Sequence, residues 1–256
     1  GVAKAMTRPT NPTIELMQAH VSVRSFSDQP VDDAMLDQVL DAARRAPTSS
    51  NWQTYSIIAV RDQEKKERLA ELAGGQSHIA QSQVFLAFAA DLHRIKIAAD
   101  IHGSSPARGL EHTLTPIIDA AIVGEAAQVA AESFGLGAVM VGGMRRRSSD
   151  VADVLGLPDE VFVVYGMSIG WPSRNPTEHG LKPRLPAELV IHRDTYSDEG
   201  AADLITAYAT ELAAFYEARG RNLDAAAWTG PVARASANLR YADLRAQLEA
   251  RGFRFD

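Results

Sequence analysis

The stretch Gly135–Gly143, GLGAVMVGG, decides between two kinds of fold. A dinucleotide-binding fingerprint of the Rossmann type has its glycines after a strand and at the start of a helix. Here an apolar helical pattern comes first, followed by glycines, the short strand pattern Ala138–Val141, and then Gly142 and Gly143. Because this order is reversed, the sequence excludes a Rossmann fingerprint at this position.

Gly142 and Gly143 follow the strand pattern and have no side chains. A flat ligand can therefore lie close to their backbone, and an ordinary turn explains the pair equally well. Arg145 comes two residues after Gly143 and could reach such a ligand. A plain surface cation is the alternative for Arg145.

Outward from this stretch, helical and strand patterns alternate without the regular spacing of βαβ units. Strand patterns occupy residues 55–60, 84–90, 138–141 and 161–169. Helical patterns occupy residues 31–46, 62–73, 113–134, 148–155, 200–218 and 238–251. The run at 84–90 is apolar throughout, as in a central strand. The mixture favours an α+β fold, or a mixed sheet with covering helices. We expect a single domain over residues 1–256, with a proline-rich arm at about 171–190 and C-terminal helices at about 200–256.

The composition excludes several classes of protein. The chain has 256 residues, a net charge of −6 and no cysteine. A general nucleic-acid binder is therefore not expected, and disulfides and thiolate metal sites are excluded. The scattered histidines predict no metal site. No run of 18 apolar residues and no signal-peptide pattern occur, so we expect a cytoplasmic protein without a membrane span.

Four polar segments could bind a ligand. In an extended chain His20, Ser22 and Arg24 share one face, opposite Val21, which suits a phosphate or a polyol; an edge strand with a solvent face is the alternative. Thr48, Ser49 and Ser50 could bind a phosphate or cap a turn. Gln76 could meet the edge of a heterocycle or lie on the surface. Lys182 and Arg184 flank Pro183, which keeps the chain extended, so the two cations suit a dianion or belong to a solvated linker.

The order of these segments resembles the nitroreductase superfamily, over roughly residues 13 to 255. The motifs are H-x-S-x-R-x-F, A-P-T-S-S-N-x-Q, G-G-Q-x-H, G-L-G-x-V-x-V-G-G, and G-W-P followed by L-K-P-R-L-P. The match is closest to the oxygen-insensitive NADPH nitroreductases and NADPH–flavin oxidoreductases. This resemblance implies an FMN-containing, intertwined homodimer, with a mainly antiparallel sheet wrapped by helices and FMN sites at the interface.

The resemblance also implies roles for individual residues. Lys182 and Arg184 would hold the FMN phosphate, and Gln76 would meet the pyrimidine edge of the flavin. The FMN-binding residues would be His20, Val21, Ser22, Arg24, Thr48, Ser49, Ser50, Gln76, Met140, Val141, Gly142, Gly143, Lys182, Pro183 and Arg184. Arg145, Arg219 and Arg221 would face the substrate or NAD(P)H.

Two positions depart from the pattern of the family. Relatives usually have arginine where this chain has Val21, so one phosphate cation is missing. Leu223 and Asp224 stand where a relative has arginines, and an acid there would repel a 2′-phosphate. NADH is therefore a plausible donor beside NADPH.

Three functions follow from the resemblance. The first is ping-pong hydride transfer from NAD(P)H through FMN to a nitroaromatic, a quinone or a similar small molecule, with no side chain required as acid or base. The second is a flavin reductase that supplies free reduced FMN to a monooxygenase partner. The third is a non-catalytic flavin-binding protein.

Overall fold

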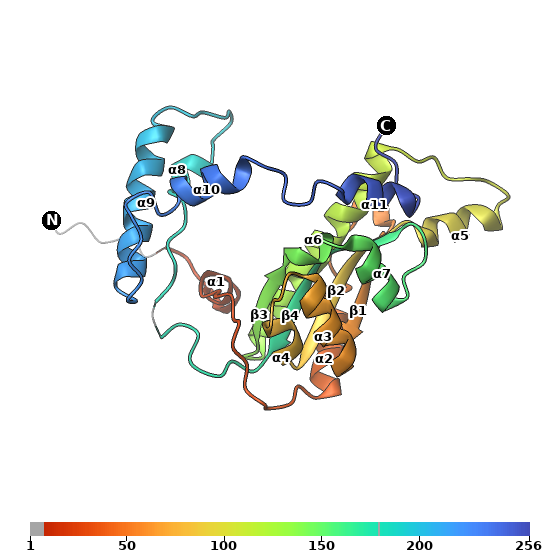
Figure 1. Cartoon of the computed structure of the whole chain (residues 1–256), viewed down its shortest axis with the longest axis horizontal. Helices are drawn as coiled ribbons and strands as arrows, with labels where there is room; N and C mark the ends of the chain where they lie inside the picture. Colours follow the sequence, from red (N-terminus) through yellow and green to blue (C-terminus); the bar gives the residue numbers. More distant parts are fainter. Residues whose placement is uncertain (1–7, 179) are drawn as a thin grey trace. The chain divides into compact units, whose positions relative to one another are not determined.

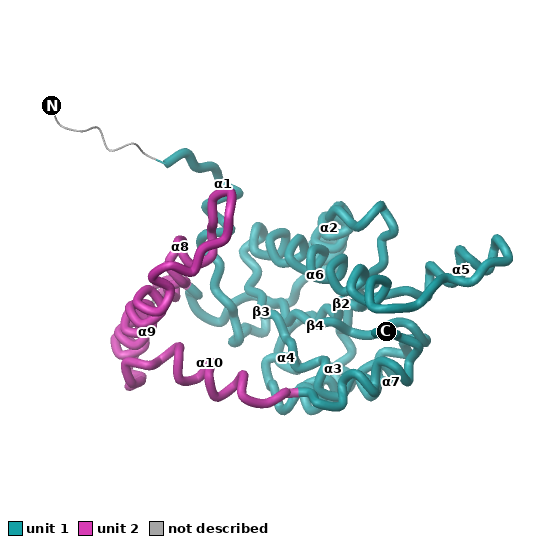
Figure 2. The backbone as a smooth tube through the Cα atoms, turned by 90° about the horizontal axis from the view of Figure 1, so that it is seen from above, with its two compact units in different colours: residues 1–176, 241–256 teal, residues 177–240 magenta. Residues whose placement is uncertain are grey.

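The computed structural model describes residues 8–178 and 180–256. The chain divides into two compact units, coloured separately in Figure 2. The first unit runs up to Pro176 and includes Tyr241–Asp256, and the second is Thr177–Arg240. The prediction of one domain over residues 1–256 stays a prediction, and residues 1–7 of that range lie outside the described part.

A four-stranded sheet forms the centre of the first unit (Figure 1). Its strands are β1 (Tyr55–Val60), β2 (Val84–Asp91), β3 (Gly137–Val141) and β4 (Val161–Gly170). They lie in the order β1-β2-β4-β3, and all three pairings are antiparallel. The predicted strands and the antiparallel sheet are therefore confirmed, and β2 is interior as its unbroken apolar run indicated.

Helices cover both faces of this sheet, as Figure 2 shows from above. On one face, Leu86 and Phe88 of β2 pack with α2 (Asp33–Ala43) and α6 (Leu110–Ser133). On the other face, Phe85 and Ala87 pack with α3 (Gln63–Leu72) and α7 (Ser148–Leu155). Successive residues of a strand point to opposite faces, so one apolar run supplies both halves of the core.

Shorter elements complete the first unit. They are α1 (Pro12–Gln18), the 3₁₀ turns η1 (Ser49–Asn51) and η2 (Gly142–Arg145), α4 (His78–Gln81), α5 (His93–Ile101) and α11 (Leu244–Ala250). The sequence predicted no element where α5 lies. The predicted segment around Ser22 is extended, but it joins the sheet through a single parallel bridge to Ala138.

The second unit contains α8 (Ala187–Val190), α9 (Ala201–Glu217) and α10 (Thr229–Ser236). Its small core joins Tyr208 and Leu212 of α9 to Ala227. The prediction of one helix over 238–251 is confirmed only in its second half, where α11 lies, and residues 238–243 are not helical. The sequence did not predict α10, which precedes this range. Residues 238–240 are exposed, whereas Leu248 of α11 enters the main core, so the helix forms in the part of the range that has an apolar surface to pack against.

The helix α6 is long and apolar enough to cross a membrane by length and composition, and 44% of its most apolar window is buried inside the protein. It packs against α2 and β2 and contains the buried carboxylate of Asp119. Such a helix is also typical of a protein core.

Candidate functional site

An extended segment around Val23 lies beside β3 and brings two of the predicted motifs together. The backbone N–H of Val23 donates to the carbonyl of Ala138 over 2.9 Å. A Cβ added at Gly137 would lie 2.7 Å from the side chain of Val23. This glycine therefore allows the close approach of the His20–Arg24 segment to the strand.

Side chains alternate along this segment as the sequence predicts. Val21 and Val23 line a small apolar cavity with Leu136, whereas Ser22 and Arg24 are exposed. The cavity of about 170 Å³ contains Glu132 but no cation, which agrees with the apolar residue at position 21.

The ring of His20 is held by an acid from α6. Its Nδ1 lies 2.6 Å from Oε1 of Glu132, and both side chains are mostly buried. The amide Nε2 of Gln128 lies 3.1 Å from the same Nδ1, so two side chains of α6 hold the ring. Sequence reasoning missed Glu132, because only the fold brings residues 20 and 132 together.

The amide of Gln76 lies directly against the glycines that follow β3. Its Nε2 donates to the carbonyl of Ala73 over 3.1 Å. A Cβ added at Gly143 would lie 2.6 Å from this Nε2 and 2.7 Å from the Ala73 oxygen. Gly143 is thus required for Gln76 to lie where it does, and the fold makes these two motifs neighbours.

His78 contacts Gln76 and is affected by the charge of Arg24. Sequence reasoning missed this residue too. Burial, and to a smaller extent the positive charge of Arg24, lower the pKa of His78. Its ring contacts Gln76 on one side and Ser168 of β4 on the other. The available signal was the last letter of G-G-Q-x-H. Gln76, His78 and Gly143 therefore form one cluster at the end of β3, and Ser22 pairs with Ala138 near the start of the same strand.

Met140, Val141 and Arg145 lie at the same end of β3. Val141 is buried in the core cluster that contains Phe85, and Met140 is half-buried against the other core cluster, which contains Leu86. The guanidinium of Arg145 donates to the carbonyl of Val164 in β4 and lies over Gly142. Its role towards a substrate stays a prediction.

The loop of Thr48–Ser50 is fixed by a buried acid of α6. Asp119 accepts from the backbone N–H of Ser49 at 3.0 Å, and from the N–H and hydroxyl of Thr54 at 3.1 and 2.6 Å. Between these two points Ser50, Asn51 and Gln53 have positive φ. Such backbone strain is found preferentially at ligand-binding sites.

Thr48–Ser50 and His20 lie at different places along α6. Their anchors, Asp119 and Glu132, are separated by about 20 Å along the axis at the normal helical rise. A single phosphate group therefore cannot contact both the Thr48–Ser50 loop and His20 of the same chain. The structure therefore does not bring the predicted phosphate residues Thr48–Ser50 and His20 together within one copy.

The second unit gathers the remaining predicted cations around aromatic side chains of α9. Nζ of Lys182 lies 5.4 Å from the ring of Tyr216, and Cζ of Arg221 lies 4.7 Å from the same ring. Arg219 stacks on Phe215, 3.3 Å from its centroid. Lys182, predicted for the FMN phosphate, and Arg219 and Arg221, predicted for the nicotinamide donor, are thus neighbours.

Pro183 and Arg184 are fixed in the same unit. The hydroxyl of Tyr208 donates to the carbonyl of Pro183 over 3.1 Å. Burial raises the pKa of Tyr208, and the charge of Arg184 opposes this shift. Asp224 accepts from the backbone N–H of Ala226 at 3.0 Å, so its carboxylate stabilises a turn.

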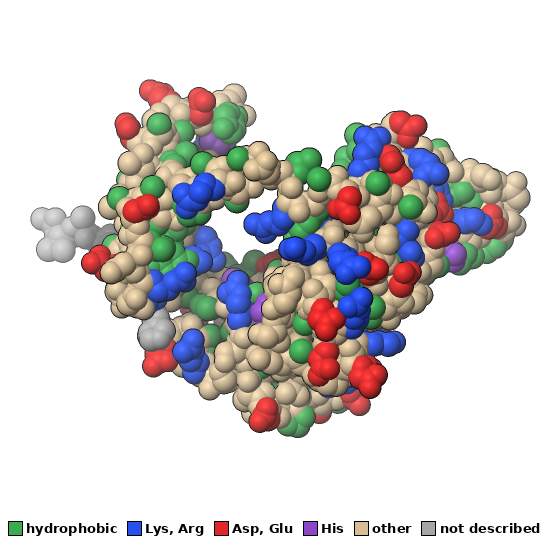
Figure 3. Space-filling view, viewed as in Figure 1, with side chains coloured by type: hydrophobic (Ala, Val, Ile, Leu, Met, Phe, Trp, Pro, Cys, Tyr) green, Lys and Arg blue, Asp and Glu red, His purple; other side chains and the backbone are tan. Residues whose placement is uncertain are grey.

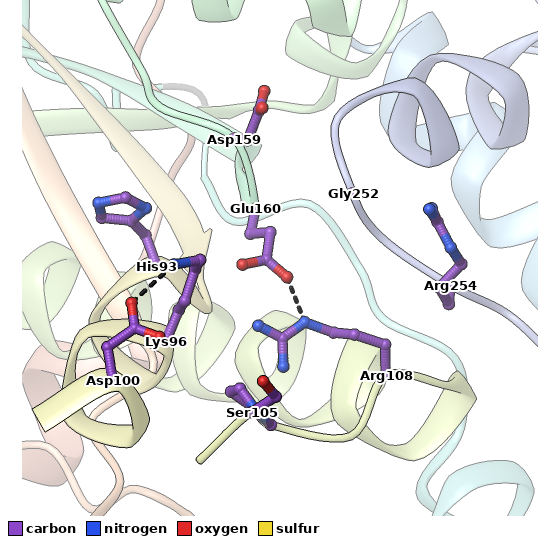
Figure 4. A pocket seen from close by; sticks show the side chains of 10 residues that line it. His93, Lys96, Asp100, Ser105, Arg108, Asp159, Glu160, Gly252 and Arg254 are labelled. Atoms are coloured by element: carbon purple, nitrogen blue, oxygen red, sulfur yellow. Dashed lines mark hydrogen bonds and ion pairs between the residues drawn. The ribbon is translucent and has the colours of Figure 1, made fainter. Parts of the chain in front are cut away.

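A separate cavity of about 660 Å³ lies among α5, the start of β4 and the C-terminal residues (Figure 4). Its charges are largely paired: Arg108 with Glu160, and Lys96 with Asp100 at 2.7 Å. Basic and acidic side chains are also interspersed over the face of the first unit in Figure 3. Paired charges offer little attraction for an anionic cofactor, so this cavity is a poorer candidate than the region along β3. Among residues 8–178 and 180–256, no group of three or more His, Asp or Glu side chains could hold a metal ion.

Comparison with known proteins places this geometry in a family. The model of the nitroreductase family matches residues 17–171, and that of the nitroreductase family C-terminal domain matches residues 182–256. The chain is 41% identical to an oxygen-insensitive NADPH nitroreductase of Salmonella typhimurium, over 88% of this chain and 90% of the relative. It is 37% identical to an FMN reductase [NAD(P)H] of Bacillus subtilis, over 96% of this chain and 99% of the relative.

A solved structure shows the same fold. The NfrA2 protein of B. megaterium superimposes with a TM-score of 0.92 at 40% identity, covering 96% of this chain and 100% of that one. Both units are included in these matches, and the strand order, the glycines and the cation segments lie within them. The chain therefore belongs to the nitroreductase family.

Proposed function

We propose that this protein is an FMN-dependent NAD(P)H oxidoreductase that reduces small electrophilic molecules. The observation that carries the proposal is the close contact of the Gln76 amide with Gly143 at the end of β3, in a chain of this family. Relatives at 37–41% identity are named as NADPH nitroreductase and FMN reductase.

The residues along β3 fit the chemical groups of FMN. The guanidinium of Arg24 suits a phosphate, and the exposed hydroxyl of Ser22 suits the ribityl chain. The amide of Gln76 complements the donor and acceptor edge of the pyrimidine. Gly142 and Gly143 leave room for a flat ring against the backbone. Lys182 and Arg184 would add two charges for the phosphate.

Hydride transfer to and from N5 is the chemistry that FMN supplies when bound. The protein would position donor and acceptor in turn at the same face, which gives ping-pong kinetics. Backbone N–H groups at Gly142 and Gly143 would stabilise negative charge on the pyrimidine side. No side chain is needed as an acid or base, so we assign no catalytic residue.

A flavin reductase is the second candidate, because a relative that covers 96% of this chain is named FMN reductase. In that case free FMN is a substrate, and a flavin-dependent monooxygenase would be the partner. Steady-state oxidation of NADPH, with a nitroaromatic or with free FMN, separates the two functions. Stimulation only by the nitroaromatic supports the first, and stimulation by free FMN supports the second.

We further propose that the protein is a homodimer and that α6 lies at the interface. Leu110, Leu114, Ile118 and Ile122 repeat every four residues on α6 and are 38–55% exposed, so they form one apolar stripe. A second copy that covers this stripe could also supply its Thr48–Ser50 loop to the FMN bound beside His20. This arrangement would account for the distance between the two segments in one chain.

Light scattering of Ile118→Glu tests the dimer. A carboxylate in the middle of an apolar interface should produce monomers and loss of bound FMN. Ile101→Glu, the same substitution at a 75% exposed residue of α5, is the control and should remain dimeric. A wild-type monomer with bound FMN would contradict the proposal.

An absorption spectrum of the purified protein, followed by anaerobic NADPH or NADH, tests the function. Flavin absorption that bleaches with a donor supports the oxidoreductase, and the faster donor shows the effect of Leu223 and Asp224. Flavin absorption that neither donor bleaches would instead support a non-catalytic flavin-binding protein.

A further inference from the structure

Three polar side chains form a continuous chain from the core to the predicted flavin site. The hydroxyl of Ser168 lies 3.1 Å from Nδ1 of His78, and Nε2 of His78 lies 3.2 Å from Oε1 of Gln76. Ser168 is fully buried, and His78 is 8% exposed. Buried polar groups of this kind contribute to a single arrangement when each donor meets an acceptor.

The donors and acceptors of this chain can be assigned from the Gln76 end. Nε2 of Gln76 donates to the carbonyl of Ala73, so Oε1 is the atom that faces His78. An amide oxygen only accepts, and Nε2 of His78 must therefore carry the proton. In the neutral ring Nδ1 is then the acceptor, and the hydroxyl of Ser168 donates to it.

Rotating the Gln76 amide by half a turn would reverse both contacts. Its oxygen would then face the carbonyl oxygen of Ala73, and its NH₂ group would face the N–H of His78. Both hydrogen bonds would be replaced by repulsive contacts in a half-buried environment. His78 and Ala73 together therefore favour one orientation of the amide.

We propose that His78 is a positioning residue: it fixes the Gln76 amide so that an N–H of Gln76 points to the pyrimidine edge of FMN. This inference rests on the proposed function, because Gln76 contacts FMN only if FMN binds along β3. Ser168 supports the same arrangement by holding the proton of His78 on Nε2. The alternative is a buried histidine that only fills the core.

The first test is the tautomer of His78, read from the ¹⁵N NMR spectrum of uniformly labelled full-length protein. Subtraction of the spectrum of His78→Phe identifies the ring among the seven histidines of the chain. We expect an unprotonated Nδ1 and a protonated Nε2, with and without FMN. A protonated Nδ1 at neutral pH would overturn the assignment, because Nε2 could not then donate to Gln76.

The second test is a double-mutant cycle on FMN affinity, measured by quenching of flavin fluorescence on addition to the apoprotein. His78→Phe should raise the Kd of FMN about tenfold, the effect of one lost hydrogen bond in the site. Gln76→Ala should raise it by a similar factor, and the double variant should bind no more weakly than Gln76→Ala alone. Independent, multiplying effects would show that His78 does not act through Gln76.

Two further variants keep the result interpretable. Ser168→Ala removes only a hydroxyl and should raise the Kd about threefold, so it replaces His78→Phe if that variant fails to fold. His93→Phe makes the same change in the cavity of Figure 4 and should leave the Kd unchanged. Wild-type protein that binds no FMN contradicts the proposed function itself, and the NMR spectrum then still decides whether His78 fixes the amide of Gln76.

Discussion

Substituting Gly143 by alanine should damage both the stability of the first unit and the affinity for FMN. The new Cβ would lie 2.7 Å from the carbonyl oxygen of Ala73, 3.1 Å from its Cβ and 2.6 Å from Nε2 of Gln76. The Gln76 side chain can rotate away, but Ala73 is part of the backbone that ends α3. Relief therefore requires a shift of α3 or of the η2 turn.

The size of the effect follows from these contacts. Overpacking at a buried position costs about 1–3 kcal/mol. A loss of 1 kcal/mol lowers the melting temperature by about 2–4 °C in a protein of this size, so we expect a decrease of about 2–12 °C. A displaced Gln76 also loses its hydrogen bonds to Ala73 and His78, which should raise the Kd of FMN about tenfold or more.

Gly142→Ala is the matched control, one residue away. Its Cβ would meet only the end of the Arg145 side chain, at 3.3 Å, and that group can move. Thermal unfolding and flavin fluorescence are measured on both variants. If Gly143→Ala keeps the wild-type melting temperature and Kd, or if Gly142→Ala lowers the melting temperature as much, the close contact with Gln76 is not a constraint on the site. Gly142→Ala is a control for stability alone, because Gly142 itself borders the proposed flavin site.

Three other predictions concern buried groups. Gly124→Ala would place a Cβ 1.6 Å from the hydroxyl of Tyr165, so its melting temperature should fall, and adding Tyr165→Phe should restore part of the loss. Asp119→Ala should cost about 2–4 kcal/mol and speed amide hydrogen exchange around Thr54, because three hydrogen bonds to the loop are lost. Burial keeps the pKa of His78 below 6.5, so the unfolded chain takes up this proton first on acidification. Stability should therefore decrease as the pH falls through 6.5, and less steeply in His78→Phe; equal slopes would show that the His78 proton does not contribute.

The strands and the strong helices could be predicted because each has a local signal. The run of 84–90 is apolar on every residue, and only a strand covered on both faces needs that pattern. Gly135 and Gly156 follow the ends of α6 and α7, where glycine is a common local signal, and both have positive φ. The segment 238–251 has helical composition throughout, but its first half finds no surface to cover, and composition does not reveal burial.

The site was predictable only in part. Its motifs could be recognised from their order, but only the fold shows that Gln76 meets Gly143 and that Val23 meets Gly137. Glu132 and Asp119 have no local signal, because each acts on a segment more than sixty residues away in the sequence. His78 was visible within a motif, but its burial and its contact with Ser168 arise from tertiary packing.

The attachment of both ends of the 49–54 loop to Asp119 has a consequence for redesign. The two ends meet one carboxylate, so an inserted or deleted residue would break at least one of the three hydrogen bonds. Changes of identity are less restricted: Trp52 is 44% exposed and has ordinary helical geometry. Ser50 and Gln53, in left-handed geometry, accept glycine, asparagine or aspartate most readily. A library that alters acceptor preference should therefore keep the length of this loop and vary its side chains, with Trp52 open to every residue type except proline, because its backbone N–H donates to the carbonyl of Ser49.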